Sequence, residues 1–246
     1  MRIRICLTLT NSISIPINHQ HTLSDIISNF LNTSESNYAS LPHQHHNINH
    51  SSSPFQLFCF STLRCRHRRV NGTSLQLGPG KLEWLVCSPV EKFLQDFTQK
   101  LAQQEYITLS GEKIFLRGIK SLPPPTLNSS AEFSCLTPVV CSHPNRHACY
   151  LTPSDEAFGE TARRNLIHKF TELHGHAPKD ENLQWQWDQD YLKRERGTKL
   201  IEYKSTFIKG AFAPFRVEGS SELIKLLYET GAGEKNASGF GMVEVQ

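Results

Sequence analysis

The order in which strands and amphipathic helices follow one another limits most strongly what this chain can fold into. The first half shows strand-like alternation or composition and helical apolar stripes in turn. The predicted elements are strands at residues 3–9, 55–63, 75–87 and 106–119, and helices with apolar stripes at residues 23–31 and 90–101. The order strand, helix, strand, strand, helix, strand is that of the ferredoxin-like, or split βαβ, module.

A proline-rich break at residues 123–125 interrupts every regular pattern and is predicted to be a linker. Beyond it, the same order partly recurs. The predicted elements are a strand at 133–141, a helix at 155–173, a basic strand pair at 191–217, a helix at 221–230 and a strand at 239–245. We therefore predict an α+β protein of two tandem ferredoxin-like (RRM-like, βαββαβ) modules, at residues 1–122 and 131–246.

Local signals add three expectations about how these elements begin and turn. Residues 75–87 are interpreted as a hairpin that Gly78, Pro79 and Gly80 interrupt. Thr22 is the predicted cap of the first helix. Ser88 and Glu91 form the predicted capping box of the second helix, with Pro89 at its first position.

Composition narrows the class of protein. The chain has 246 residues, with 38% hydrophobic and 20% charged side chains, which suits a globular fold. No apolar run reaches the roughly 20 residues that span a bilayer, and the alternation at residues 3–9 is unlike the continuous apolar core of a secretory signal. The 7 cysteines are scattered without a Cys-x-x-Cys pair, so we expect reduced thiols and a cytoplasmic protein.

Basic charge is concentrated locally, although the net charge is only +3. One cluster comprises Arg64, Arg66, Arg68 and Arg69. A second cluster lies in residues 193–216 and includes Lys193, Arg194, Lys199 and Lys204. Local clusters of this kind are typical of surfaces that follow a phosphate backbone. Solvated faces of exposed hairpins are the competing interpretation for either cluster alone.

The C-terminal run GAGEKNASGFG contains glycines at Gly231, Gly233, Gly239 and Gly241. A dinucleotide-binding fingerprint has its glycines between a strand and a following helix, whereas these glycines follow a predicted helix and precede a predicted strand. Glycines permit positive φ and close approach of a backbone. Free amide groups here, together with Lys235, are therefore predicted to bind phosphate oxygens.

The tail GAGEKNASGFGMVEV resembles the glycine-rich signature that ends the CRISPR repeat-cleaving endoribonucleases of the RAMP superfamily. The resemblance extends to the segments IPINHQ at 15–20, YASLPH at 38–43 and FQLFCFS at 55–61. It implies two ferredoxin-like modules and a metal-independent cleavage of the repeat in precursor CRISPR RNA. In that reaction the 2′-hydroxyl attacks the adjacent phosphate, leaving a 2′,3′-cyclic phosphate and a 5′-hydroxyl.

The same resemblance suggests which residues carry the chemistry. His43 is the best match to the family's general base, and His46, His45 or His50 in the same loop are alternatives. A histidine suits this role because its ordinary pKa is near neutral pH. Some family members also use a tyrosine and a lysine, at the positions that match Ser28 and Gln56 here. Neither residue supplies an acid or a cation, so that set is not carried over.

Other interpretations of these residues remain open at this stage. A polar loop rich in histidine is often only a surface loop, and a single histidine within it is often inert. A metal site at His43, His45 and His46, or at the scattered Cys135, Cys141, His143, His147 and Cys149, lacks the paired ligand spacing of structural zinc. Trp185, Trp187 and Tyr191 could stack on bases or fill a core.

We therefore expect an endoribonuclease that matures CRISPR RNA without a metal or other cofactor, with His43 and His46 as catalytic candidates. The alternative is a non-catalytic subunit that binds repeat RNA within an effector complex, and a third hypothesis is an RNA-recognition module unrelated to CRISPR. The expected partners are precursor and mature CRISPR RNA and an interference complex. The chain is expected to be a monomer or a homodimer. The predicted RNA-binding residues are Arg64, Arg66, Lys193, Arg194, Lys199, Lys204, Gly231, Gly233, Lys235, Gly239 and Gly241.

Overall fold

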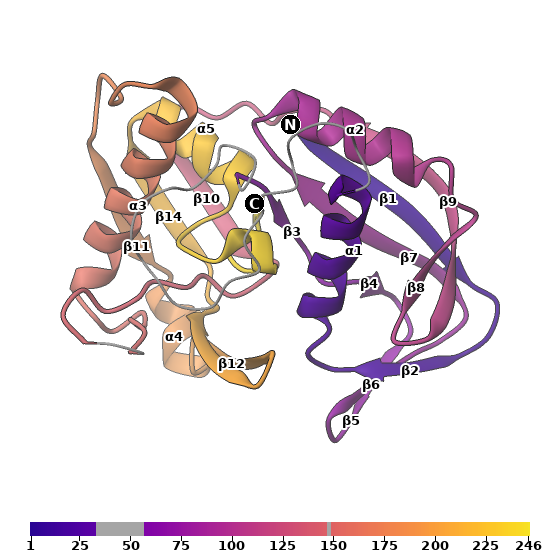
Figure 1. The fold of residues 1–246 in the computed structure, drawn as a ribbon. Helices are drawn as coiled ribbons and strands as arrows, with labels where there is room; N and C mark the ends of the chain where they lie inside the picture. The colour runs from indigo at the N-terminus through magenta and orange to yellow at the C-terminus, as the bar shows by residue number, and fades with distance from the viewer. Residues whose placement is uncertain (33–56, 147–148) are drawn as a thin grey trace.

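The computed structural model describes residues 1–32, 57–146 and 149–246, which form two sheet-and-helix halves side by side (Figure 1). Each half has its own apolar core. One core gathers residues from Ile3 to Ile114, and the other gathers residues from Phe133 to Val243. The mixed α+β class that the sequence predicts is confirmed.

The N-terminal sheet has the strand order β3-β7-β1-β9-β8, with β4 also paired to β7. Its strands are β1 (Arg2–Leu9), β3 (Cys59–Phe60), β4 (Arg64–Cys65), β7 (Gly80–Cys87), β8 (Tyr106–Leu109) and β9 (Glu112–Leu122). Helices α1 (Gln20–Asn32) and α2 (Glu91–Leu101) pack against one face of it through Leu23, Ile27, Phe93 and Phe97. All these pairings are antiparallel. The central order and directions are those of a βαββαβ module.

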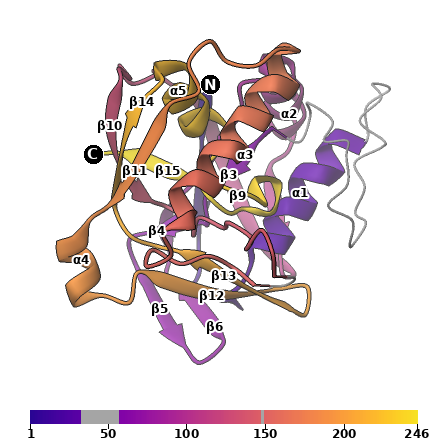
Figure 2. The same ribbon diagram turned by 90° about the vertical axis from the view of Figure 1, so that its left-hand side faces the viewer.

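The C-terminal sheet repeats this arrangement in the antiparallel order β11-β14-β10-β15. Its strands are β10 (Ser130–Cys135), β11 (Leu183–Trp187), β14 (Phe215–Gly219) and β15 (Val243–Val245). The helices α3 (Ala157–His174) and α5 (Ser221–Thr230) supply the covering layer (Figure 2). Helix α3 ends at His174, and the Gly175 that follows has a φ of 75°, the left-handed conformation of a helix cap.

Several smaller elements lie at the lower edge of both halves in Figures 1 and 2. They are a sheet of β2 (Ile13–Pro16), β5 (Arg68–Asn71) and β6 (Ser74–Leu77), the short helix α4 (Gln189–Arg194), and the hairpin of β12 (Thr198–Tyr203) with β13 (Thr206–Ala211). No helix among the described residues combines the length and the apolar character needed to cross a bilayer.

Several local predictions are wrong. Residues 75–87 are not a hairpin, because β6 pairs with β2 and β5 whereas β7 pairs with β1. Thr22 does not cap α1, which already begins at Gln20. The basic segment 191–217 is more than a strand pair, since it holds the end of α4 and strands β12, β13 and β14. Strands β2, β5 and β11 were not predicted.

The capping box predicted at the start of α2 is wrong: the N-cap residue is Val90, which has no side-chain cap bond, and the Ser88 amide donates to the Met1 carbonyl instead of to Glu91. The Ser88 hydroxyl accepts a hydrogen bond from the backbone N–H of Val90 at 3.0 Å and donates to the carbonyl of Leu57 at 2.7 Å. The helix itself begins at Glu91. Ser88 therefore ties the entry of α2 to the chain that leads into β3.

Candidate nucleic-acid interface

The glycine-rich loop that follows α5 lies between the two halves of the molecule. The Ser24 hydroxyl of α1 donates to the carbonyl of Ala237 at 2.9 Å, and the Cys59 thiol of β3 donates to the carbonyl of Phe240 at 3.1 Å. Both donors belong to the N-terminal half. The loop therefore forms an interface between the halves, called the joint below, at which the C-terminal half contacts α1 and β3.

The glycines of this loop are buried against protein atoms. A Cβ on Gly231 would lie 2.9 Å from the Cys59 sulfur, and one on Gly239 would lie 2.7 Å from the Phe60 ring. One on Gly233 or Gly241 would collide with a backbone carbonyl oxygen. The glycines thus allow close packing of backbone.

This placement differs from the cradle of free amides that the sequence led us to expect. The amide of Gly241 donates to the carbonyl of Pro138 at 2.7 Å, and that of Glu234 donates to the carbonyl of Val140 at 2.7 Å. Both amides are already occupied by protein. The exposed residue of the loop is Lys235, whose φ of 59° turns it outward between two anchored neighbours. Lys235 is therefore the residue of this loop whose side chain is exposed to a ligand.

The two basic clusters, far apart in the sequence, approach each other at the lower edge of the molecule. Arg68 on β5 belongs to the N-terminal half, and Lys199 on β12 belongs to the C-terminal half. Burial and the nearby charge of Arg68 lower the pKa of the Lys199 ammonium. The Lys199 nitrogen also lies 3.5 Å from the centre of the Phe212 ring. This contact holds the cation in place beside the arginine cluster.

The remaining predicted cations fall into two groups. Arg64 pairs with Glu244 at 3.5 Å, Lys204 pairs with Asp25 at 3.2 Å, and both of these ion pairs join the two halves. Lys193 lies on α4, where it pairs with Asp190 at 2.8 Å, and Arg194 bonds to the Asp190 carbonyl at 3.1 Å. Exposed pairs of this kind contribute little to stability. Their cations are accordingly available to phosphate.

Arg66, Arg68 and Arg69 are exposed. Within the described part of the chain, no carboxylate lies within the 4.0 Å of an ion pair from any of the three. Two exposed apolar side chains, Leu200 and Phe207, stand nearby on the β12–β13 hairpin, each 62% exposed. The hairpin register makes them diagonal neighbours on one face. An uncompensated basic edge with an exposed aromatic ring is suited to single-stranded nucleic acid.

A cavity of about 410 Å³ opens between the N-terminal half and the turn of the β12–β13 hairpin. It is lined by residues that include Asn18, His21, Thr73, Glu202 and Lys204. The His21 ring meets the Tyr203 ring edge to face, with centroids 6.2 Å apart. The cavity therefore carries polar groups from both halves beside the basic edge.

The catalytic candidates His43 and His46 lie outside the described residues, as do His45, His50 and Gln56. Among described histidines, His19 is 1% exposed and has a structural environment. Its Nδ1 lies 3.1 Å from the Ile17 carbonyl, and its Nε2 accepts from the Leu63 amide at 3.4 Å. Burial lowers the pKa of the His19 imidazole, so the neutral form is favoured.

Ser28, at the position that matches a family tyrosine, is 6% exposed on α1. Its side chain is therefore almost entirely covered by protein. Across the described residues, no three side chains of histidine, cysteine, aspartate or glutamate gather as they would around a metal ion.

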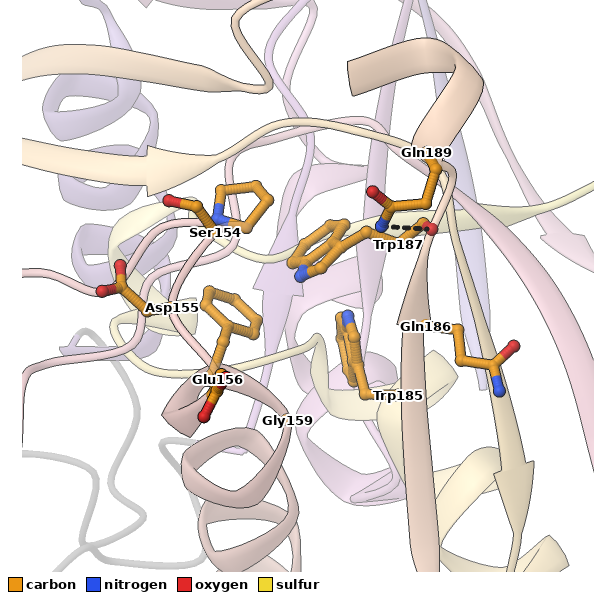
Figure 3. A pocket seen from close by; sticks show the side chains of 10 residues that line it. Ser154, Asp155, Glu156, Gly159, Trp185, Gln186, Trp187 and Gln189 are labelled. Carbon is orange, nitrogen blue, oxygen red and sulfur yellow. Dashed lines mark hydrogen bonds between the residues drawn. The ribbon is translucent and has the colours of Figure 1, made fainter. Parts of the chain in front are cut away.

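A separate cavity of about 440 Å³ lies at the start of α3, on the C-terminal half (Figure 3). Asp155 and Glu156 stand on one side of it and Trp185 and Trp187 on the other. The Trp185 ring stacks on Phe215 with centroids 3.9 Å apart, and Trp187 is 9% exposed. These tryptophans fill the core, as one of the two sequence interpretations held. The carboxylates make this cavity unfavourable for phosphate.

Lys169 on α3 is a residue that the sequence reasoning missed. It is 7% exposed and its ammonium contacts the glycine-rich loop from beneath. The sequence did contain a signal for this residue, because Lys169 lies on the apolar stripe of the helix formed by Phe158, Ala162, Leu166 and Phe170. A cation on a buried helix stripe is rare unless it is paired.

The sequence of this chain matches family models over most of its length. The family described as "CRISPR associated protein Cas6, C-terminal" matches residues 122–245, and "CRISPR-associated protein Cas6, N-terminal" matches residues 14–120. A CRISPR-associated endoribonuclease Cas6 of Methanocaldococcus jannaschii is 28% identical over 246 residues, covering 99% of this chain and 92% of that protein.

A second relative, from Pyrococcus horikoshii, is described as a putative CRISPR-associated endoribonuclease-like protein. It is 27% identical and covers 100% of this chain and 99% of its own length. The solved structure of a Cas6-related gene product from Pyrococcus furiosus superimposes with a TM-score of 0.85 at 23% identity, covering 100% of this chain and 98% of that one. That likeness shows a shared fold.

Proposed function

The chain belongs to the Cas6 family, and on this premise we propose that it is an endoribonuclease that binds and cleaves the repeat of precursor CRISPR RNA. The M. jannaschii relative carries the name of that activity. The observation in this chain that supports the proposal best is that the basic β12–β13 hairpin lies against the other half, where Lys204 pairs with Asp25 at 3.2 Å and shares a cavity with Thr73 in the turn between β5 and β6. Together these segments build one basic edge that a phosphate backbone can follow.

The RNA is expected to run along this edge past Lys235. The Phe207 ring offers a surface on which an unpaired base can stack, since every base has a π-face. Lys204 and His21 line the cavity between the halves. Contacts of this kind hold the backbone without reading sequence, whereas sequence is read from splayed bases.

We propose that cleavage is a metal-independent transesterification. A base removes the proton from a 2′-hydroxyl, whose oxygen bonds to the adjacent phosphorus. The bond from phosphorus to the 5′-oxygen breaks, and this oxygen takes up a proton. His43 is the proposed base and His46 the proposed second proton carrier. Cations beside the phosphate stabilise its developing charge.

The second candidate function is repeat binding without cleavage, within an effector complex. The buried Ser28 favours it, because a catalytic tyrosine cannot be replaced by an inaccessible serine. The description of the P. horikoshii relative as endoribonuclease-like agrees with this candidate. We also propose that the protein acts in the cytoplasm, where its seven cysteines would stay reduced, and that it is a monomer or a homodimer.

Labelled cognate repeat RNA, incubated with the protein in EDTA, separates the two functions. We expect a product with a cyclic phosphate, and no product from RNA carrying a 2′-deoxy group at the cleaved position. His43→Ala and His46→Ala are expected to lower the cleavage rate by 10²–10⁴-fold at unchanged affinity. His176→Ala, which alters an exposed histidine of the C-terminal half, is the matched control. Tight binding without cleavage would instead establish the non-catalytic function.

A further inference from the structure

The ammonium group of Lys169 is enclosed by the glycine-rich loop. Its nitrogen donates to the carbonyl of Gly231 at 2.9 Å, to the carbonyl of Gly233 at 2.7 Å and to the Asn236 side-chain oxygen at 2.6 Å. An ammonium group has three N–H bonds to donate. All three are used, and all three acceptors belong to one loop.

The Asn236 side chain extends this network to the rest of the loop. Its amide nitrogen donates to the carbonyls of Ala232 at 3.2 Å and Phe240 at 2.9 Å. Directly or through Asn236, the cation is therefore connected to four carbonyls of the loop. Without the ammonium group, the Gly233 carbonyl and the Asn236 side-chain oxygen would lose this donor, at the cost of desolvating a polar group. The Gly231 carbonyl, in contrast, would keep the Thr230 hydroxyl at 3.2 Å.

Lys235 stands between two residues that the protein holds firmly. On one side, the Glu234 carboxylate accepts hydrogen bonds from Ser142 N at 3.0 Å and Oγ at 2.6 Å. On the other side, Asn236 is held by Lys169. Lys235 itself has a φ of 59°, a left-handed conformation that is uncommon for a non-glycine residue. The direction in which Lys235 points is thus set by its two neighbours.

We propose that Lys169 is a positioning residue for RNA: its buried charge shapes the glycine-rich loop so that Lys235 faces the phosphate backbone. The role resembles that of a bound cation around which a loop folds, except that the cation here is supplied by helix α3. This inference rests on the proposed function for its RNA partner. The folding of the loop around Lys169 does not depend on RNA.

The first test therefore uses no RNA. Hydrogen exchange of the amides in residues 231–242 is compared between the wild-type chain and Lys169→Met, with Lys225→Met on the exposed face of α5 as the matched control. We expect protection of the loop amides to fall by on the order of tenfold or more in Lys169→Met alone, while that of the β10–β14 pair is retained. Unchanged protection in the loop would overturn the proposal.

The second test is a double-mutant cycle on binding to repeat RNA. In the wild-type background, Lys235→Ala is expected to reduce the slope of log affinity against log salt by about 0.7, the value for one phosphate contact on a single strand. In the Lys169→Met background the same change is expected to have almost no effect. If Lys169 contributed only to global stability, Lys235→Ala would have the same effect on RNA binding in both backgrounds. That result would contradict the proposal that Lys169 positions Lys235.

Two further variants keep the outcome interpretable. Asn236→Ala removes one of the three acceptors and leaves the cation, so it replaces Lys169→Met if that variant does not fold. Arg66→Ala, on the basic edge, is expected to combine additively with Lys169→Met. If the wild-type chain bound no repeat RNA, the proposed function would fail, and the exchange experiment would still decide whether Lys169 shapes the loop.

Discussion

Substitution of Gly241 by alanine tests directly whether the glycine-rich loop is a packed joint. Gly241 has a φ of +77°, and an added Cβ would collide with the Ala232 carbonyl oxygen. Gly72, in the turn between β5 and β6, is the matched control: its φ is +59°, but an added Cβ would have nothing within 4 Å. Both alanines must adopt the left-handed conformation, at roughly 1–2 kcal/mol each. Only Gly241→Ala must also displace backbone.

The displacement affects hydrogen bonds that close the loop. The Ala232 amide donates to the Gly241 carbonyl at 2.8 Å, and the Asn236 side chain donates to the Ala232 carbonyl at 3.2 Å. At about 0.5–1.5 kcal/mol for each bond, their loss brings the expected destabilisation by Gly241→Ala to roughly 2–5 kcal/mol. Gly72→Ala should remain near its conformational cost of about 1–2 kcal/mol.

Urea unfolding measures both values, provided that the slope with denaturant is unchanged between variants. A difference of more than about 1 kcal/mol between the two glycines supports the packed joint. Equal losses of stability in the two variants would mean that the loop accommodates the added Cβ without a further loss of free energy. The reasoning about buried backbone would then be wrong, and the glycines would be free to serve a ligand.

Three further outcomes are expected. Burial lowers the pKa of Lys169 to about 8, so its charged form is disfavoured in the folded chain. The free energy of unfolding, measured with urea, should therefore rise as the pH increases from about 8 towards the pKa of the unfolded lysine, near 10.4. Lys169→Met should abolish that rise, whereas its persistence would assign it to another group. Arg68→Gln should reduce the salt slope of RNA binding by about 0.7 in a titration of affinity, and an unchanged slope would remove Arg68 from the interface. Phe207→Ala should weaken binding of single-stranded RNA by about 1–3 kcal/mol without changing the melting temperature, and undiminished affinity would exclude stacking on this ring.

The elements predicted best are those whose signals are local. Helix α5 spans Ser221–Thr230 as predicted, because the Ser220 hydroxyl accepts from the Leu223 amide and an apolar stripe follows. Strand β11 (Leu183–Trp187) was missed although apolar and polar residues alternate within it. Its five residues are too few to stand out within a longer irregular stretch. Short strands depend on their partners, and β14 supplies the partner here.

Pairing between distant segments could not be predicted from the sequence. Residues on either side of Gly78 have the composition of two strands, which is compatible with a hairpin or with membership of two sheets. The choice depends on β1 and β2, which offer the two segments different edges. The approach of Arg68 to Lys199 is likewise a property of the assembled halves. Charge clustering indicated both surfaces but not that they share one edge.

The position of the glycine-rich loop changes what its glycines contribute to function. In a phosphate-binding loop they would leave amides free for a ligand, whereas here they let the loop come close enough for α1, β3 and α3 to hold it together. Ser24 and Cys59 come from one half and Lys169 from the other. If RNA is held as proposed, by Arg68 on one half and by Lys199 and Lys235 on the other, it spans this same joint. A movement of the joint would then separate these cations, so we expect the rigidity of the buried loop to set how much of the basic surface one RNA strand can use.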